Sequence, residues 1–502
     1  KEQKKKHRGL LCAFLGVMLC VSLLPATVFA EVGTQAQNEE AMAASEQSFV
    51  QTQDEEQVTT PADSSDSNAA QQEESDTPPT QASDESKGTA SSNLSEQDAT
   101  QSEEADTPPE ESITETGTAD PEASSLVPAE DIVAIVELAD GTTTSHTTIE
   151  EAFSEVNKST SAIITLQKNC TVINPVTLLV DSLKNVTLDL NGYTLTGNGQ
   201  TSVLGVNQGA TLTLEDSSQA QTGIITGGSA SGGGGIRVNT AATFIMNGGT
   251  ISGNDATNGG GIWAVRATFV MNGGTISNNA CSSDGGGVYS TGTFTMNDGI
   301  ISRNTALNGG GIGIANDATF TMKGGIVSEN TGFSRGGGVS IMGGNFTMDG
   351  GTISKNSTSI DDTSVVIKGL GGGVYLHNPQ SSFTLNEGTI SENTAIFGGG
   401  VDGYVSNSVI TMHGGKVSGN TAVEGAGIYA TYLIMNSGEI SGNVATTSIP
   451  TSRPESLTPA GGGIYASFLH LNGGTVSNNT ASCGGGIYAK EFYATGGTIS
   501  EN

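Results

Sequence analysis

Phe244-Ile-Met-Asn-Gly-Gly-Thr-Ile-Ser-Gly-Asn254 is the stretch that decides the fold, because variants of it occur ten times before this 502-residue chain ends. The closing asparagine recurs at spacings of 23 to 37 residues, at positions 254, 279, 304, 330, 356, 393, 420, 443, 479 and 502. A period in this range with alternating apolar positions is typical of a solenoid, in which each repeat stacks on its neighbours.

Apolar and polar positions alternate within each repeat, as they do in a strand with one buried face. The position of Phe244 is always large and apolar, whereas the next position is mixed and often polar, so the first is expected to face inward. The inward set is Phe244, Phe269, Phe294, Phe320, Phe346, Phe383, Ile410, Leu433, Leu469 and Phe492. The Ile251 position and the Ile or Val after each glycine cluster supply two more inward columns. Three short strands per coil, with no crossover helix, predict an all-β right-handed parallel β-helix of about 13 coils.

The recurring asparagines and glycines are interpreted as structural. Identical polar side chains stacked coil upon coil can satisfy one another in a hydrogen-bonded ladder, and asparagine tolerates a tight corner. The predicted ladder is Asn254, Asn279, Asn304, Asn330, Asn356, Asn393, Asn420, Asn443 and Asn479. The glycine clusters precede no helix, so they do not read as phosphate loops. Ala315 stands where the calcium-binding nonapeptide pattern requires Asp.

Composition divides the chain into four parts. Residues 1–30 read as a signal peptide, with basic residues before an apolar run that ends at Val28-Phe-Ala30. Residues 31–130 carry 25 acidic residues against a single lysine, Lys87, and predict an extended, disordered stalk. Residues 131–235 are expected to form an N-terminal cap and the first irregular coils. Residues 236–502 are the regular repeats, which we expect to be truncated at residue 502.

The cap is predicted to contain one short helix. Thr148-Ile-Glu-Glu151 is a capping box, and it opens a stretch whose apolar residues fall on one helical face: Ile149, Ala152, Phe153 and Val156. A solenoid needs its open end covered, and this helix is a plausible lid.

Net charge and cysteine content limit the partners, metal sites and disulfides that the sequence predicts. The net charge of −33 argues against nucleic acid or an anionic membrane as partner. The apolar run of the signal is short for a membrane span. Cys170, Cys281 and Cys483 are far apart and have no metal-ligand spacing, so we expect no disulfide framework, metal site or cofactor.

Two family resemblances rest on these motifs. Leu-Asp-Leu-Asn-Gly at 188–192, with the repeating Gly-Gly-Thr-Ile-Ser-x-Asn and Gly-Gly-Gly-Ile-Tyr units, resembles β-helix surface proteins of Gram-positive bacteria in the pectate-lyase-like superfamily. A weaker likeness is to polymorphic outer-membrane autotransporter passengers, through Phe-x-x-Asn units such as Phe244 to Asn247. Lys323 and Asp349 depart from that motif. The resemblance implies a secreted, extracellular or cell-wall-associated protein.

The outward column after each glycine cluster is the candidate ligand-binding site, because six of its ten members are aromatic. These are Trp263, Tyr289, Tyr375, Tyr429, Tyr465 and Tyr488. Exposed aromatic rows can stack on sugars or on peptide side chains, although tyrosine also favours strands for structural reasons alone. Insertions at Ser357–Leu370 and Val444–Ala460 fall at the same corner and are either recognition loops or tolerated surface length.

Enzymatic relatives with this fold use clustered carboxylates, often with calcium and an Arg or Lys base. The carboxylates here read as solvated loop charges, out of register with any basic partner: Asp284, Asp361, Asp362, Asp402 and Glu424. His377, His413 and His470 fall on unrelated columns. We therefore assign no catalytic residue and predict an adhesin or ligand-binding scaffold, whose partner is an extracellular glycan or a surface protein of a host or neighbouring cell. A polysaccharide lyase or glycoside hydrolase acting on an acidic polysaccharide is the alternative.

Overall fold

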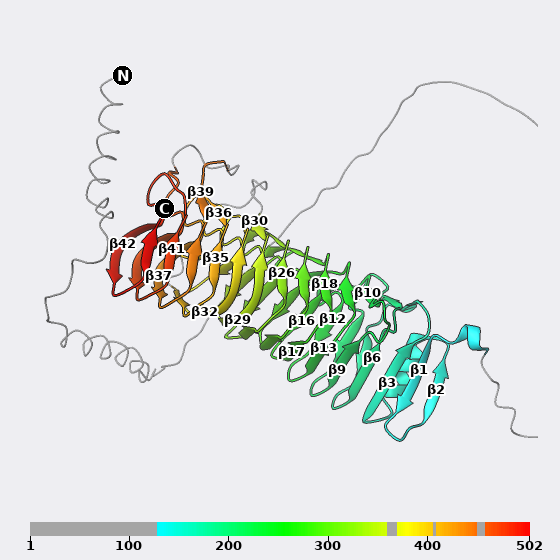
Figure 1. Cartoon of the computed structure of the whole chain (residues 1–502). Helices are drawn as coiled ribbons and strands as arrows, with labels where there is room; N and C mark the ends of the chain where they lie inside the picture. Colours follow the sequence, from blue (N-terminus) through cyan, green and yellow to red (C-terminus); the bar gives the residue numbers. More distant parts are fainter. Residues whose placement is uncertain (1–127, 359–368, 405–407, 449–456) are drawn as a thin grey trace, which may run out of the picture. The chain divides into compact units, whose positions relative to one another are not determined.

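The computed structural model describes residues 128–358, 369–404, 408–448 and 457–502 (Figure 1). The predicted signal peptide, nearly all of the predicted stalk and parts of both insertions lie outside these residues. The described part is a nearly all-β parallel solenoid of about 12 turns with a single α-helix, close to the 13 coils predicted. The predicted fold class is confirmed.

The first stack of strands carries the phenylalanine column. Its strands pair in parallel and in register, so that Phe320 lies between Phe294 and Phe346. The strands are β3 (Ser161–Leu166), β6 (Asn185–Asp189), β9 (Thr211–Glu215), β13 (Thr243–Met246), β17 (Thr268–Met271), β21 (Thr293–Met296), β25 (Thr319–Met322), β29 (Asn345–Ser354), β32 (Ser382–Ser391), β34 (Val409–Met412), β37 (Ile428–Met435), β40 (Ile464–Leu471) and β42 (Ile487–Ala494).

The second stack carries the Ile251 column, and β29 and β32 are long enough to belong to both stacks. Its other strands are β4 (Cys170–Thr171), β7 (Thr194–Thr196), β10 (Ile224–Thr226), β14 (Thr250–Ser252), β18 (Thr275–Ser277), β22 (Ile300–Ser302), β26 (Ile326–Ser328), β35 (Lys416–Ser418), β38 (Glu439–Ser441), β41 (Thr475–Ser477) and β43 (Thr498–Ser500).

The third stack follows the glycine clusters and is continued by β37, β40 and β42. Its other strands are β5 (Leu178–Val180), β8 (Leu204–Val206), β12 (Ile236–Val238), β16 (Ile262–Ala264), β20 (Val288–Ser290), β24 (Ile312–Ala315), β28 (Val339–Met342), β31 (Val374–Leu376) and β33 (Val401–Gly403). Short strands lie at the corner between the second and third stacks: β11 (Ser229–Gly232), β15 (Asp255–Asn258), β19 (Ala280–Cys281), β23 (Thr305–Asn308), β27 (Thr331–Arg335), β30 (Ser357–Thr358), β36 (Thr421–Ala422) and β39 (Val444–Ala445).

One continuous hydrophobic core runs inside the coils, because the inward columns of all three stacks meet there. From Phe244 to Phe383 the six phenylalanine rings stack on one another, with centroids 4.5–5.2 Å apart. This spacing is close to the separation of neighbouring strands, so the ring stack follows directly from the register.

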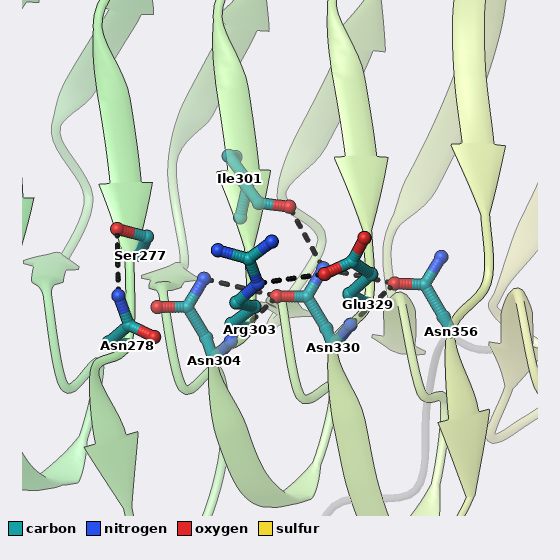
Figure 2. Close-up of polar contacts among 8 residues, drawn as sticks. All are labelled: Ser277, Asn278, Ile301, Arg303, Asn304, Glu329, Asn330 and Asn356. Carbon is teal, nitrogen blue, oxygen red and sulfur yellow. Dashed lines mark hydrogen bonds and ion pairs between the residues drawn. The ribbon is translucent and has the colours of Figure 1, made fainter.

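A buried asparagine ladder runs beside this core (Figure 2). Asn304 Nδ2 donates to Asn330 Oδ1 at 3.1 Å, and Asn330 Nδ2 donates to Asn356 Oδ1 at 3.0 Å. Asn330 Nδ2 also donates to the Ile301 carbonyl at 2.9 Å, while Asn330 Oδ1 accepts the backbone N–H of Asn304 at 2.9 Å. Each amide therefore serves both its neighbours and the backbone of an adjacent coil.

The tight corner beside the ladder is taken by the residue before each asparagine, so the expectation that asparagine itself adopts it is wrong. Arg303, Glu329 and Lys355 have φ of 56°, 58° and 57°, in the left-handed region. The side chains of these residues point to solvent, where Arg303 Nε pairs with Glu329 Oε2 of the next coil at 2.7 Å (Figure 2). The asparagines adopt ordinary backbone conformations because their side chains must turn inward to hydrogen-bond.

The parallel stack ends at its N-terminal side in an antiparallel arrangement. Strand β1 (Ala134–Leu138) pairs antiparallel with β2 (Thr143–His146) and with β3 (Figure 1). A 3-10 turn, η1 (Ala129–Asp131), precedes β1, and helix α3 (Ile149–Val156) follows β2. The predicted apolar face of the helix is buried and joins the main core.

The capping box is only half formed. The Thr148 hydroxyl accepts the Glu151 N–H at 3.2 Å, but the Glu151 carboxylate accepts from the Thr147 hydroxyl. We expect Thr148→Ala to lower the free energy of unfolding by about 1 kcal/mol, because the helix loses its side-chain cap. Urea unfolding of the full chain measures this change. Thr147→Ala is the matched control, and an equal loss in that variant would contradict the assignment.

Candidate functional site

The six predicted ligand-binding aromatic residues lie in one column on the outer face of the third stack. The backbone register joins Trp263 to Tyr289 and then passes through Gly313 and Ser340 to Tyr375. It continues through Asp402 to the tyrosines of β37, β40 and β42, which are Tyr429, Tyr465 and Tyr488. The column thus exists as a geometric feature, and its ligand-binding role stays a prediction.

The column is not a continuous exposed row, which corrects the expectation of a free aromatic surface. Tyr375 is 3% exposed and Tyr429 is 7% exposed. They pack in a second hydrophobic cluster outside the coils, which we call the outer cluster. Its buried members are Leu370, Tyr375, Ile396, Phe397, Val423 and Tyr429, with Tyr404, Leu457 and Tyr465 packed against them. Residues at the insertion corner therefore fold back over the middle of the column.

The accessible aromatic residues form two separate pairs. Trp263 and Tyr289 are half-buried neighbours, and the Arg237 guanidinium lies 5.0 Å from the centroid of the Trp263 ring. Tyr465 and Tyr488 are stacked with centroids 4.8 Å apart, and Tyr488 is 39% exposed. Burial raises the pKa of Tyr465 to about 12, with Glu424 and Tyr404 adding to the effect.

A polar column runs beside the first pair. Asp284 bridges in parallel to Asn308, which in turn pairs with Arg335 of the next coil. The Asp284 carboxylate accepts from the Ser283 hydroxyl at 2.7 Å and from Asn308 Nδ2 at 2.9 Å. Asp284 and Arg335 therefore share one column of the backbone register, two coils apart with Asn308 between them, which corrects the expectation that Asp284 is out of register with every basic residue. This register could not be predicted from the sequence, because the spacings between Asp284, Asn308 and Arg335 differ from coil to coil.

Arg335 connects the polar column to the aromatic column. Its guanidinium lies 5.8 Å from the centroid of the Tyr375 ring. Burial lowers the pKa of His377, Arg335 lowers it further, and Asp284 opposes both. Burial raises the pKa of Tyr375 to about 12, helped by Asp402 and opposed by Arg335. Residues from four coils therefore act on one another electrostatically.

Several buried side-chain atoms in the polar column and near it have no hydrogen-bond partner among the described residues. Asn308 Oδ1, Arg335 Nε, Ser340 Oγ and Asp402 Oδ2 are buried and have no hydrogen-bond partner among the described residues. Buried polar groups are nearly always paired, so Asn308 Oδ1 and Arg335 Nε mark a place in the polar column where a ligand or water can complete the hydrogen bonding, whereas Asp402 Oδ2 lies beneath the outer cluster.

Asp402 is not a solvated loop charge, which corrects the sequence interpretation. Its side chain is fully buried, and Oδ1 accepts the Tyr404 N–H at 3.0 Å. Burial raises the pKa of Asp402 to about 8, although the Tyr404 N–H and Arg335 oppose this shift. Asp361 and Asp362, from the same predicted set, lie outside the described residues.

Sequence reasoning missed a second outward aromatic contact on the first stack. The rings of Tyr432 and Phe468 stack at 4.8 Å, and Tyr432 is 40% exposed. The sequence does contain a signal for this contact, because both aromatic residues directly precede an inward-facing leucine of the first stack. His470 contacts Tyr493 on the same outer face, whereas His413 contacts Asn436.

Within the described part of the chain, no group of three or more His, Cys, Asp or Glu side chains is placed to hold a metal ion. Cys170, Cys281 and Cys483 are free, and burial raises the pKa of the first two to about 12. No helix among the same residues has the length and apolarity to cross a membrane.

Comparison with known proteins adds no relative: no protein-family model, curated protein or solved structure matches this chain. Function must therefore be argued from the site itself.

Proposed function

We propose that this protein is an exported, surface-displayed β-solenoid that binds an extracellular glycan. The N-terminal segment reads as a secretion signal, and the repeats build a rigid scaffold of stacked coils. We call the proposed contact area the binding surface, and define it as Trp263, Asp284, Tyr289, Asn308, Arg335 and His377. The observation that carries the proposal is that the half-buried Tyr289 lies in the same coil as Asp284, whose charge acts on it, while Asn308 and Arg335 of the following coils carry unsatisfied buried atoms.

The composition of the binding surface suits a sugar. Trp263 and Tyr289 offer ring faces to the apolar side of a pyranose. Asp284 and Asn308 offer acceptors and donors to hydroxyl groups, and Arg335 is a fixed donor with an unsatisfied Nε. Because each residue comes from a regular strand or corner, the groups keep their relative positions without a ligand.

Glycan-array screening of the full chain, followed by titration calorimetry with the best hit, tests this proposal. Tyr289→Ala and Arg335→Gln should each weaken binding about tenfold, which corresponds to roughly 1.4 kcal/mol. Tyr432→Ala is the matched control, since it removes an exposed tyrosine of the first stack and should bind normally. Absence of any hit, or equal loss in all three variants, would refute the proposal.

A second function is favoured by one arrangement, and we propose it as the alternative: cleavage of an acidic polysaccharide. His377 has a lowered pKa and is therefore neutral near pH 7, so it can accept a proton. Arg335 beside it offers a charge that would stabilise a substrate carboxylate. Proton removal next to a carboxylate, followed by loss of the leaving sugar, is the chemistry these groups could support.

Incubation of the full chain with pectins, alginates and glycosaminoglycans, with and without calcium, separates the two proposals. A lyase produces unsaturated chain ends that absorb in the ultraviolet, and His377→Ala should abolish them. Binding without new chain ends supports the scaffold. New ends that persist in His377→Ala would exclude this residue as the base.

A further inference from the structure

The outer cluster and the main core are separate hydrophobic units. The main core lies inside the coils, whereas the outer cluster covers the outer face of β31, β33 and β37. Separate units of this kind can open independently, because stability is not uniform across a structure. Opening of the outer cluster would expose Tyr375 and Tyr429, the two covered members of the aromatic column.

Asp402 lies beneath the middle of the outer cluster. Its in-register neighbours on the two adjacent coils are Tyr375 and Tyr429, both members of that cluster. The Asp402 side chain is fully buried, and its Oδ2 has no hydrogen-bond partner among the described residues. Protonated, this oxygen is a neutral hydroxyl in an apolar site. Ionised, it is a buried charge whose carboxylate accepts one hydrogen bond among the described residues, from the Tyr404 N–H.

The titratable and charged groups around Asp402 do not neutralise its charge. Tyr375, Tyr404 and Tyr429 are phenols, and burial raises the pKa of Tyr375 and Tyr429, so both stay neutral in mild alkali. Glu424 is a further acidic residue and acts on Tyr429. Arg335 is the cation that acts on Asp402, but its guanidinium also lies over the Tyr375 ring.

We propose that Asp402 is a proton-operated latch: its neutral form keeps the outer cluster closed over the aromatic column, and its ionised form opens the cluster. The inference does not depend on the identity of any ligand. Opening adds Tyr375 and Tyr429 to the accessible aromatic residues of the column.

The direction of the pH effect follows from linkage. Burial raises the pKa of Asp402 from 3.8 to about 8 in the closed state, whereas an opened, hydrated carboxyl would titrate near its ordinary value. Below about pH 4 both states are protonated, and the closed state keeps its full stability. Between about pH 4 and pH 8 the closed state loses a factor of about ten in its equilibrium constant per pH unit. Between about pH 4 and about pH 8 the equilibrium constant for closing therefore falls by about 10⁴-fold. A change of this size is enough to shift a two-state equilibrium from mostly closed to mostly open.

Hydrogen exchange with mass spectrometry on the full chain from pH 5 to pH 9.5, corrected with an unfolded reference, tests the latch. We expect peptides covering 396–404 and 423–429 to lose protection between pH 5 and about pH 8 and to change little above pH 8, while strand β25 of the main core stays protected. Asp402→Asn removes the titratable proton and keeps the shape, so its protection should be independent of pH. Asp317→Asn, at an exposed position, is the control and should behave like the wild type.

Three results would overturn the proposal: no step in the wild type, an unchanged step in Asp402→Asn, or a step shared equally by β25. The first and third use the unmodified protein, so the test holds even if Asp402→Asn folds poorly.

Discussion

Asn330→Ala is expected to lower the free energy of unfolding by about 4 kcal/mol, because it strips partners from several buried groups that cost about 1–3 kcal/mol each when left unpaired. The Ile301 carbonyl loses its side-chain donor, and the backbone N–H and Nδ2 of Asn304 lose their common acceptor. Water cannot replace these bonds, since Asn304, Asn330 and Asn356 are fully buried.

An exposed asparagine stack in the same molecule supplies the control. Asn272 Nδ2 donates to Asn247 Oδ1 at 2.9 Å, and Asn272 Oδ1 accepts from Asn297 at 2.8 Å, but these side chains face solvent. Asn272→Ala should therefore change the free energy of unfolding by no more than about 0.5 kcal/mol. Urea unfolding of both variants measures the difference. Equal effects would mean that burial does not decide the strength of the ladder.

Phe320→Ala is expected to lower the free energy of unfolding by about 4 kcal/mol through lost apolar burial and the cavity left behind. The Phe320 ring is fully buried, and its centroid lies 4.7 Å from that of Phe294 and 4.5 Å from that of Phe346. Backbone pairing on both sides prevents the coils from collapsing into the cavity. The two broken ring contacts add about 0.5–1.5 kcal/mol each to the loss from area alone.

Two further variants separate packing from aromatic character. Phe320→Leu should lose about 1–3 kcal/mol, less than Phe320→Ala, because it breaks the same two ring contacts but leaves a smaller cavity, and leucine is the native residue at Leu433 and Leu469 of the same column. Phe333→Ala removes a phenylalanine that is 41% exposed and should be nearly neutral, within about 0.5 kcal/mol. Urea unfolding and thermal melting measure the stability loss of each variant and so rank the three. A loss in Phe333→Ala as large as that in Phe320→Ala would contradict the assignment of the core.

These stability effects bear on function because the binding surface is built on the same coils. Arg335 ends β27, and the ladder residues Asn330 and Asn356 lie close to it along the chain and in the next coil. A defect in the ladder should loosen the corner that holds Arg335. The outer cluster rests instead on residues from the insertion corner, so its opening can be separated from loss of the core.

The sequence by itself determined the solenoid, its inward columns, the asparagine ladder and the short capping helix. These features follow from local rules: a period of two within strands, one repeat per coil, and a capping threonine before an amphipathic turn. Because every repeat carries the same pattern, the register of stacking leaves no alternative that buries Phe244, Phe269 and their equivalents together. The corners were also located, although the left-handed residue proved to be the one before the asparagine, and the short strands at the corners were not predicted.

Only the tertiary structure decided which outward residues are accessible. The repeat pattern places Tyr375, Asp402 and Tyr429 outside the main core, but residues of other coils then cover them in the outer cluster. The alignment of Asp284, Asn308 and Arg335 in one column likewise depends on stacking across coils of unequal length. Burial and charge pairing on the outer face depend on contacts between distant irregular segments, and no local periodicity encodes those contacts.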